Sequence, residues 1–124
     1  MLEHSMAEVD LFSPPSGRLL LAREDGVAAG VACVKSIRKD TCEIKRMYVR
    51  PVYRGKKIGR NLLNQLIQDA KEIGYSKILL ESPQFMREAH SLYRSVGFKD
   101  IELYPEAEMS EDFQEYMVYM ELEL

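Results

Sequence analysis

The sequence predicts an α/β fold on one mixed β-sheet, in which an antiparallel meander precedes a β-α-β-α-β-β order with a parallel central pair. Three observations carry this prediction. Residues 18–49 form short apolar runs separated by turn signals, which is typical of antiparallel strands. From residue 58 the apolar residues recur at helical spacing. A strand–helix–strand unit follows, and such a crossover joins parallel strands.

The antiparallel half begins after Pro14 and Pro15, because proline is not accommodated inside a central strand. Strands over 18–24 and 27–37 are joined by Asp25-Gly26, a hairpin signal. The next strand covers residues 41–49 and has two unlike faces. One face carries Cys42, Ile44, Arg46 and Tyr48, and the other carries Glu43, Lys45, Met47 and Val49.

The second half alternates helices and strands. An amphipathic helix starts at Ile58 and ends before Gly74, which is typical of a helix C-cap. We expect a strand at 75–82 and a second amphipathic helix at 85–97. The last two strands are expected at 98–104 and 116–124.

Length and composition limit the function classes. The chain has 124 residues, with 46% hydrophobic and 30% charged, so we expect a single domain over residues 1–124. Its leading segment covers 1–17 and its core 18–124. The formal net charge of −3 favours neither nucleic acid nor a membrane surface as a partner. No apolar run is long enough to predict a transmembrane helix.

Cysteine and histidine give no sign of a metal site. Cys33 and Cys42 lie in apolar, strand-like surroundings and lack CxxC spacing, so we expect reduced core residues. With only His4 and His90 in addition, we expect no metal. Reduced cysteines and a start without an apolar leader predict a cytoplasmic protein.

The segment YRGKKIGR at residues 53–60 joins a strand to a helix start. Unpaired N–H groups and the positive end of the helix dipole at that place favour an anion such as pyrophosphate. Gly55 and Gly59 let the backbone approach a ligand. The spacing fits neither a P-loop nor a dinucleotide fingerprint. The alternative is a solvated basic helix start. Positive charge comes from Lys56, Lys57 and Arg60.

Two stretches, EIKRMYVRPVYRGKKIGRNLLNQLI at 43–67 and AHSLYRSVGF at 89–98, resemble the GNAT superfamily of acetyl-CoA-dependent N-acetyltransferases. The resemblance extends from Gly17 to Leu124. It implies that the parallel strands splay apart to admit coenzyme A, whose pantetheine arm pairs with the main chain of 47–49 while backbone amides bind its pyrophosphate. The implied cofactor-binding residues are Met47, Tyr48, Val49, Arg54, Gly55, Lys56, Lys57, Ile58, Gly59 and Arg60.

The chain departs from the family pattern at one position of this loop. The family has arginine or glutamine, two residues, glycine, one residue, then glycine or alanine. Arg54 and Gly59 match the ends of that pattern, but Lys57 replaces the middle glycine. We expect Lys57 to be a first-turn helical residue that does not need a positive φ, so that coenzyme A binding is retained.

The resemblance also implies two catalytic residues. Glu43 precedes Arg54 by eleven positions, the separation at which several family members carry the base that accepts the amine proton. Burial on its strand would raise its pKa. Tyr93 in SLYRSVGF matches a family tyrosine that faces the coenzyme sulfur and can protonate the thiolate. The alternatives are a solvent-facing Glu43 paired with Lys45 or Arg46, and a core Tyr93.

Other residues support weaker hypotheses. His90 is more simply structural, and Ser82 and Gln84 are candidates for contact with the acceptor. Acidic residues at 105–115 form either a solvated loop or an attractant for a cationic amine. Aromatic candidates for an acceptor pocket, which are alternatively core residues, are Phe85, Tyr104 and Tyr116.

The predicted function is transfer of an acetyl group from acetyl-CoA to a primary amine, either a small molecule or a peptide N-terminus, within a ternary complex. The alternative is a catalytically silent module that binds coenzyme A. We expect the usual first strand and most of the first two family helices to be absent, with residues 6–12 as a helix tail. A homodimer would then cover the shortened N-terminal side.

Overall fold

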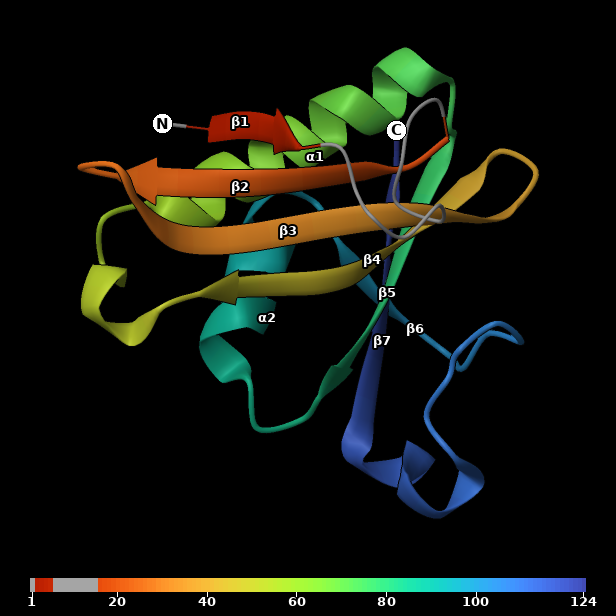
Figure 1. Ribbon diagram of the computed structural model, residues 1–124. Coiled ribbons are helices and arrows are strands. Elements are labelled where there is room, and N and C mark those ends of the chain that lie inside the picture. The colour runs from red at the N-terminus through yellow and green to blue at the C-terminus, as the bar shows by residue number, and fades with distance from the viewer. Residues whose placement is uncertain (1, 6–15) are drawn as a thin grey trace.

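The computed structural model describes residues 2–5 and 16–124. Its described strands form one seven-stranded sheet in the order β1-β2-β3-β4-β5-β7-β6 (Figure 1). The strands are β1 (Leu2–Ser5), β2 (Arg18–Glu24), β3 (Val27–Arg38), β4 (Thr41–Val49), β5 (Lys77–Pro83), β6 (Lys99–Ile101) and β7 (Met117–Glu123). The helices are α1 (Ile58–Ile73) and α2 (Arg87–Ser95), with 3₁₀ turns η2 (Pro51–Tyr53) and η3 (Glu111–Tyr116).

The predicted mixed sheet is confirmed. β2, β3 and β4 form the antiparallel meander, and β4 pairs with β5 in parallel. The turn between β2 and β3 has positive φ at both Asp25 (51°) and Gly26 (79°), as a type I′ hairpin requires. Gly74 closes α1 with φ 111°, in the C-cap position expected from the sequence.

Strand β1 was missing from the prediction, which treated residues 1–17 as a leading segment without a strand. Leu2–Ser5 pairs antiparallel with Leu19–Ala22 of β2 and forms one edge of the sheet. Four residues without a clear alternating pattern give little signal of a strand. The helix tail expected at 6–12 lies outside the described residues.

The parallel pair separates part-way along β4. Residues Thr41–Ile44 pair with Lys77–Leu80 of β5. Beyond Ile44, β4 continues to pair with β3 alone, whereas β5 continues along β7 to Pro83. Figure 1 shows the two strands diverging from this point. A gap therefore opens beside the last five residues of β4.

A β-bulge coincides with this separation. Val34 lies opposite Ile44, but the preceding residue, Cys33, lies opposite Arg46, so β4 contains one residue more than β3 there. The two-faced pattern predicted for β4 is therefore wrong beyond Ile44. One extra residue reverses the faces, and Met47 and Val49 pack with the helix-side core instead of facing away from it.

The main core lies between the sheet and both helices, which sit behind the sheet in Figure 1. Leu62, Leu63 and Leu66 of α1 are fully buried there. The opposite sheet face carries a smaller buried cluster of Leu79, Tyr104 and Tyr119. Cys33 and Cys42 are buried and free, as predicted. Among the described residues, no helix is both long and apolar enough to cross a membrane.

Candidate active site

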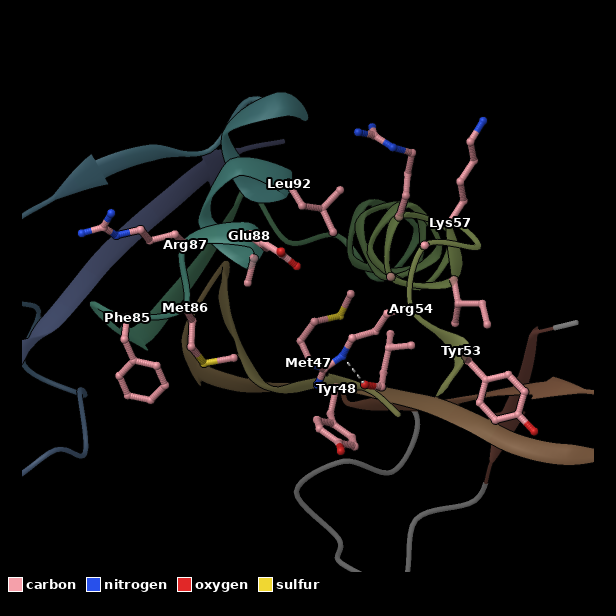
Figure 2. Close-up of a pocket in the computed structure, with 16 residues that line it drawn as sticks. Met47, Tyr48, Tyr53, Arg54, Lys57, Phe85, Met86, Arg87, Glu88 and Leu92 are labelled. Carbon is pink, nitrogen blue, oxygen red and sulfur yellow. Dashed lines mark hydrogen bonds between the residues drawn. The ribbon is translucent and has the colours of Figure 1, made fainter. Parts of the chain in front are cut away.

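A cavity of about 870 Å³ lies in the gap where β4 leaves β5. β4 forms its floor, the loop and first turn of α1 form one wall, and the start of α2 forms the other (Figure 2). Every predicted cofactor-binding residue except Lys56 contributes to the lining. The lining residues are Met47, Tyr48, Val49, Tyr53, Arg54, Gly55, Lys57, Ile58, Gly59, Arg60, Phe85, Met86, Arg87, Glu88, Ala89 and Leu92.

The backbone of the loop was predicted wrongly at Lys57. This residue has φ 64° and ψ 16°, in the left-handed region, and α1 begins only at Ile58. Gly55 also has a positive φ, of 85°. The chain enters the helix through a left-handed residue, which explains why a glycine suits this position in the family pattern. Figure 2 shows the Lys57 side chain extending away from the β4 floor.

Replacing Lys57 with glycine should therefore stabilise the protein. Glycine removes the strain energy of a left-handed lysine from the folded state, and it also adds conformational entropy to the unfolded chain. Because the first effect is larger, the free energy of unfolding should rise by about 0.5–1 kcal/mol. Urea denaturation of Lys57→Gly measures this gain. Lys56→Gly is the matched control, because Lys56 lacks a positive φ. Equal destabilisation by both substitutions would contradict the assigned backbone strain.

The first turn of α1 presents free backbone donors to the cavity. The first intrahelical bond runs from the Asn61 amide to the Lys57 carbonyl at 3.0 Å. The amides of Ile58, Gly59 and Arg60 precede that bond, and no side chain caps them within the described residues. Unpaired N–H groups and the helix dipole together stabilise an anion at this position.

Two arginines add positive charge to the cavity walls. Arg54 Nε donates to the Val49 carbonyl at 3.0 Å, drawn in Figure 2, and its guanidinium lies 5.7 Å from the Tyr48 ring centroid. Arg60 Nη2 donates to Ser95 Oγ at 3.1 Å and so links α1 to α2. Lys56 is not part of the lining; its ammonium lies 5.7 Å from the centre of the Tyr53 ring.

Glu43 lies outside the cavity lining, on the sheet face opposite the helices. It is only 1% exposed, so the solvent-facing part of the alternative is wrong, whereas its pairing with Lys45 is present, with Lys45 Nζ 4.0 Å from Oε1. Tyr104 Oη donates to its Oε2 at 2.6 Å, and Oε1 lacks a hydrogen-bond partner. Burial raises the pKa of this carboxyl, in the direction expected from the sequence.

Tyr93 is also absent from the lining and is 5% exposed. Its ring packs against Phe98 with centroids 5.6 Å apart. Within the described part of the chain its hydroxyl has no hydrogen-bond partner, and burial raises its pKa to about 12. The structure thus places the Tyr93 side chain in the core between α2 and the sheet.

The weaker candidates separate into buried and exposed groups. His90 is buried, with Nε2 2.9 Å from Ser82 Oγ, and burial lowers its pKa. Phe85 and Tyr116 are exposed, whereas Tyr104 is in the small cluster. Gln84 is tied to η3 through the backbone of Tyr116 and Glu115.

Residues 105–115 form an ion-paired connection that ends in η3, and two of their carboxylates are bound to the strands. Glu106 makes two bonds to Arg38, at 2.8 and 2.9 Å. Glu108 lies 2.9 Å from Lys35 Nζ and 2.7 Å from Lys45 Nζ. Sequence reasoning missed these pairs and the Tyr104–Glu43 bond, since their members lie at least 61 residues apart and no local pattern links them.

Comparison with known proteins settles the family. The sequence profile described as "Acetyltransferase (GNAT) family" matches residues 2–98, well over half of the chain. The chain belongs to the GNAT acetyltransferase family. Membership of this family confirms the predicted class of enzyme, an acyltransferase that uses acetyl-CoA.

Curated relatives are named as acetyltransferases. An uncharacterized N-acetyltransferase of Schizosaccharomyces pombe is 37% identical over 115 residues, covering 91% of this chain and 68% of that protein. An IAA acetyltransferase of Azospirillum brasilense is 33% identical over 96 residues, covering 77% and 63%. The chain therefore spans about two thirds of the length of these relatives.

A solved N-acetyltransferase structure supports the fold. The PaiA N-acetyltransferase of Thermoplasma acidophilum, solved in complex with coenzyme A, is 25% identical with a TM-score of 0.73. The match covers 88% of this chain and 62% of that one. The splayed parallel pair predicted for the GNAT-like sheet is thus part of a fold that holds coenzyme A in a related protein.

Proposed function

We propose that this protein transfers the acetyl group of acetyl-CoA to a primary amine, by direct transfer in a ternary complex. The observation that carries the proposal is the convergence of two backbone features on one cavity. The β4 edge at Met47–Val49 has no partner from β5, and the free amides of Ile58–Arg60 lie at the adjoining helix start.

These features suit the two parts of the cofactor. An open strand edge can pair with the amide-bearing pantetheine arm, in the manner of strand addition. Unpaired amides at a helix start, with Arg54 and Arg60 beside them, suit a pyrophosphate. We propose that the cofactor-binding residues are those predicted from the sequence, with Lys56 contributing charge from outside the lining.

The bound cofactor supplies a thioester carbonyl, and two side chains of the protein handle protons. We propose that Glu43 accepts the proton of the attacking amine, directly or through water, because its pKa is raised toward the working pH by burial. Tyr93 keeps its proton at neutral pH, because burial raises its pKa to about 12, and it donates to the leaving thiolate.

A second candidate is a coenzyme A-binding module without turnover. It is favoured by the positions of Glu43 and Tyr93, neither of which lines the cavity. Mixing the protein with acetyl-CoA and a panel of small primary amines and peptide N-termini, and measuring thiol release, separates the two functions. We expect release only when an amine is present. Binding of acetyl-CoA without release for any amine would favour the silent module.

We propose four further points on the basis of the sequence. They are an acceptor that is a small-molecule amine or a peptide N-terminus, a homodimer, a single domain over 1–124 and a cytoplasmic location. Two exposed aromatic side chains, Phe85 and Tyr116, are available to an acceptor near η3. Gel filtration with light scattering measures the oligomeric state directly.

Gly59 and Arg60 offer a test of the cofactor position that leaves the fold intact. A Cβ added at Gly59 would make ordinary contacts, 3.5 Å from Leu92 Cδ2 and 3.7 Å from Met47 Cε and Val49 Cγ2. Alanine also ends the family pattern at this position, so Gly59→Ala should keep acetyl-CoA affinity and keep or raise thermal stability. Arg60→Ala removes a positive charge from the cavity lining, so acetyl-CoA should bind about tenfold more weakly.

Asn64→Ala is the control for Arg60→Ala. Asn64 lies on an exposed part of α1 away from this cavity, so the change improves helix propensity alone. Calorimetric titration should give unchanged acetyl-CoA affinity for Asn64→Ala. Unaltered affinity in Arg60→Ala would place the cofactor elsewhere.

A further inference from the structure

We propose that Tyr104 and Glu108 are positioning residues for Glu43: Tyr104 anchors one carboxylate oxygen, and Glu108 keeps Lys45 at ion-pair distance from the other without a hydrogen bond, so that this oxygen can accept the acceptor's proton. The proposal rests on the proposed function, in which Glu43 is the base. The N–H bond of the amine breaks, an O–H bond forms at Glu43 Oε1, and the proton later passes to solvent.

The anchored oxygen is Oε2. Tyr104 lies in the connection between β6 and η3, 61 residues from Glu43 in the chain, and its hydroxyl donates to Oε2 at 2.6 Å. That length is typical of an O–H donor bound to an ionised acceptor. The Tyr104 ring is itself fixed edge-on against Tyr119, with centroids 5.8 Å apart. A single, short bond from a packed side chain therefore sets the orientation of the carboxylate.

The free oxygen is Oε1. It is buried, and it has no hydrogen-bond partner within the described residues. A buried acceptor without a donor is uncommon, and functional sites are among the places where one is retained. The Glu43 side chain as a whole is 1% exposed, so it is held in place by its surroundings and not by solvent.

Glu108 controls the nearest cation. Lys45 Nζ lies 4.0 Å from Glu43 Oε1, which is an ion-pair distance but too long for a hydrogen bond, and 2.7 Å from Glu108 Oε2. The other oxygen of Glu108 accepts from Lys35 Nζ at 2.9 Å. Lys35 and Lys45 are thus both bound to Glu108. Without Glu108, Lys45 would be free to hydrogen-bond Oε1 and compete with the amine proton.

The charges around Glu43 come from several elements. Lys35 faces it from β3, Lys45 from β4, and Tyr104 and Glu108 from the connection after β6. Burial raises the pKa of Glu43; the bond from Tyr104 and the two lysines lower it, and Glu108 raises it. Burial and the bond to Glu43 raise the pKa of Tyr104, with smaller rises from Glu81 on β5 and Tyr119 on β7.

This network predicts opposite effects for two substitutions. Tyr104→Phe removes a donor to the carboxylate and should move the acidic limb of the kcat/KM profile to higher pH. Glu108→Gln releases Lys45 toward Oε1 and should move the same limb to lower pH. If the two substitutions only loosened the connection between β6 and η3, they would not shift the acidic limb of the kcat/KM profile in opposite directions.

Glu106→Gln is the matched control. Glu106 ties the same connection to Arg38 of β3, at 2.8 and 2.9 Å, and is not among the groups that act on Glu43. This variant should leave the limb unshifted. A carbon-13 carboxyl titration by NMR, with the Glu43 signal assigned from Glu43→Gln, follows the same group independently of turnover.

The proposal is supported when the NMR titration and the acidic limb both move up in Tyr104→Phe and down in Glu108→Gln. Shifts of the same sign, or none, overturn it while leaving acetyl transfer by the wild-type protein intact. An NMR titration that moves while the limb stays fixed also overturns it, because Glu43 is then not the base. Wild-type protein that binds acetyl-CoA but acetylates no amine overturns the proposed function and this inference together.

Discussion

Replacing Glu43 with glutamine is expected to lower kcat/KM for acetyl transfer by about 10²- to 10⁴-fold, the usual contribution of a general base. Glutamine retains an oxygen that can accept the 2.6 Å bond from Tyr104, but it cannot take a proton from the amine. Steady-state kinetics over a range of pH measures the loss, and the acidic limb of the profile should disappear with it.

Acetyl-CoA affinity is the control for Glu43→Gln. Glu43 is not part of the cavity lining, so calorimetry should give the wild-type dissociation constant. A variant with unchanged affinity and wild-type turnover would remove Glu43 from the mechanism. A variant that fails to bind acetyl-CoA would indicate instead that the buried amide has disturbed the sheet.

Tyr93→Phe is the second substitution with a large expected effect. Phenylalanine preserves the packing against Phe98, and the hydroxyl that is lost has no hydrogen-bond partner in the described part of the chain. Thermal stability should therefore be unchanged or slightly higher. If the hydroxyl protonates the leaving thiolate, turnover should fall by about 10²-fold.

Acyl donors with poorer and better leaving thiols distinguish proton donation by Tyr93 from a packing role. Acyl donors whose thiol leaves more readily need less help from an acid, so the defect in Tyr93→Phe should shrink with them. Equal defects for all donors would assign Tyr93 to orientation of the site and not to proton transfer. Wild-type rates in the variant would leave Tyr93 as a core residue.

Most of the fold follows from local patterns in the sequence. Apolar runs, the Asp25-Gly26 turn and the Gly74 cap predict strands and helices that the structure confirms within a few residues. The parallel pair follows from the strand–helix–strand order alone. These features are set by neighbours in the chain, so a single sequence contains the information.

The details of the site depend on contacts that the sequence does not display. The bulge that turns Met47 and Val49 toward the helices is one extra residue within a regular-looking strand. The left-handed φ of Lys57 follows from how the loop meets α1, and lysine itself gives no sign of it. Both features lie beside the cavity, where a strand separates and a helix begins.

Long-range polar contacts were equally hidden. Glu43 was chosen from its spacing to Arg54, but its partner Tyr104 belongs to a connection whose packing is decided only in the assembled sheet. The same holds for the carboxylates at 106 and 108, which pair with β3 and β4. Charge patterns predicted a solvated loop, and most of residues 105–115 are exposed, but they gave no sign of these two ion-paired carboxylates.

Calorimetric titration of acetyl-CoA into the wild-type protein tests the central claim, that the cavity beside β4 holds the cofactor at the start of α1. Dephospho-coenzyme A and ATP serve as comparison ligands. The predicted result is binding of acetyl-CoA at micromolar concentration, retained in large part by dephospho-coenzyme A and not shared by ATP. Absence of acetyl-CoA binding at millimolar concentration would contradict the account, including the assignment of the cavity as the cofactor site.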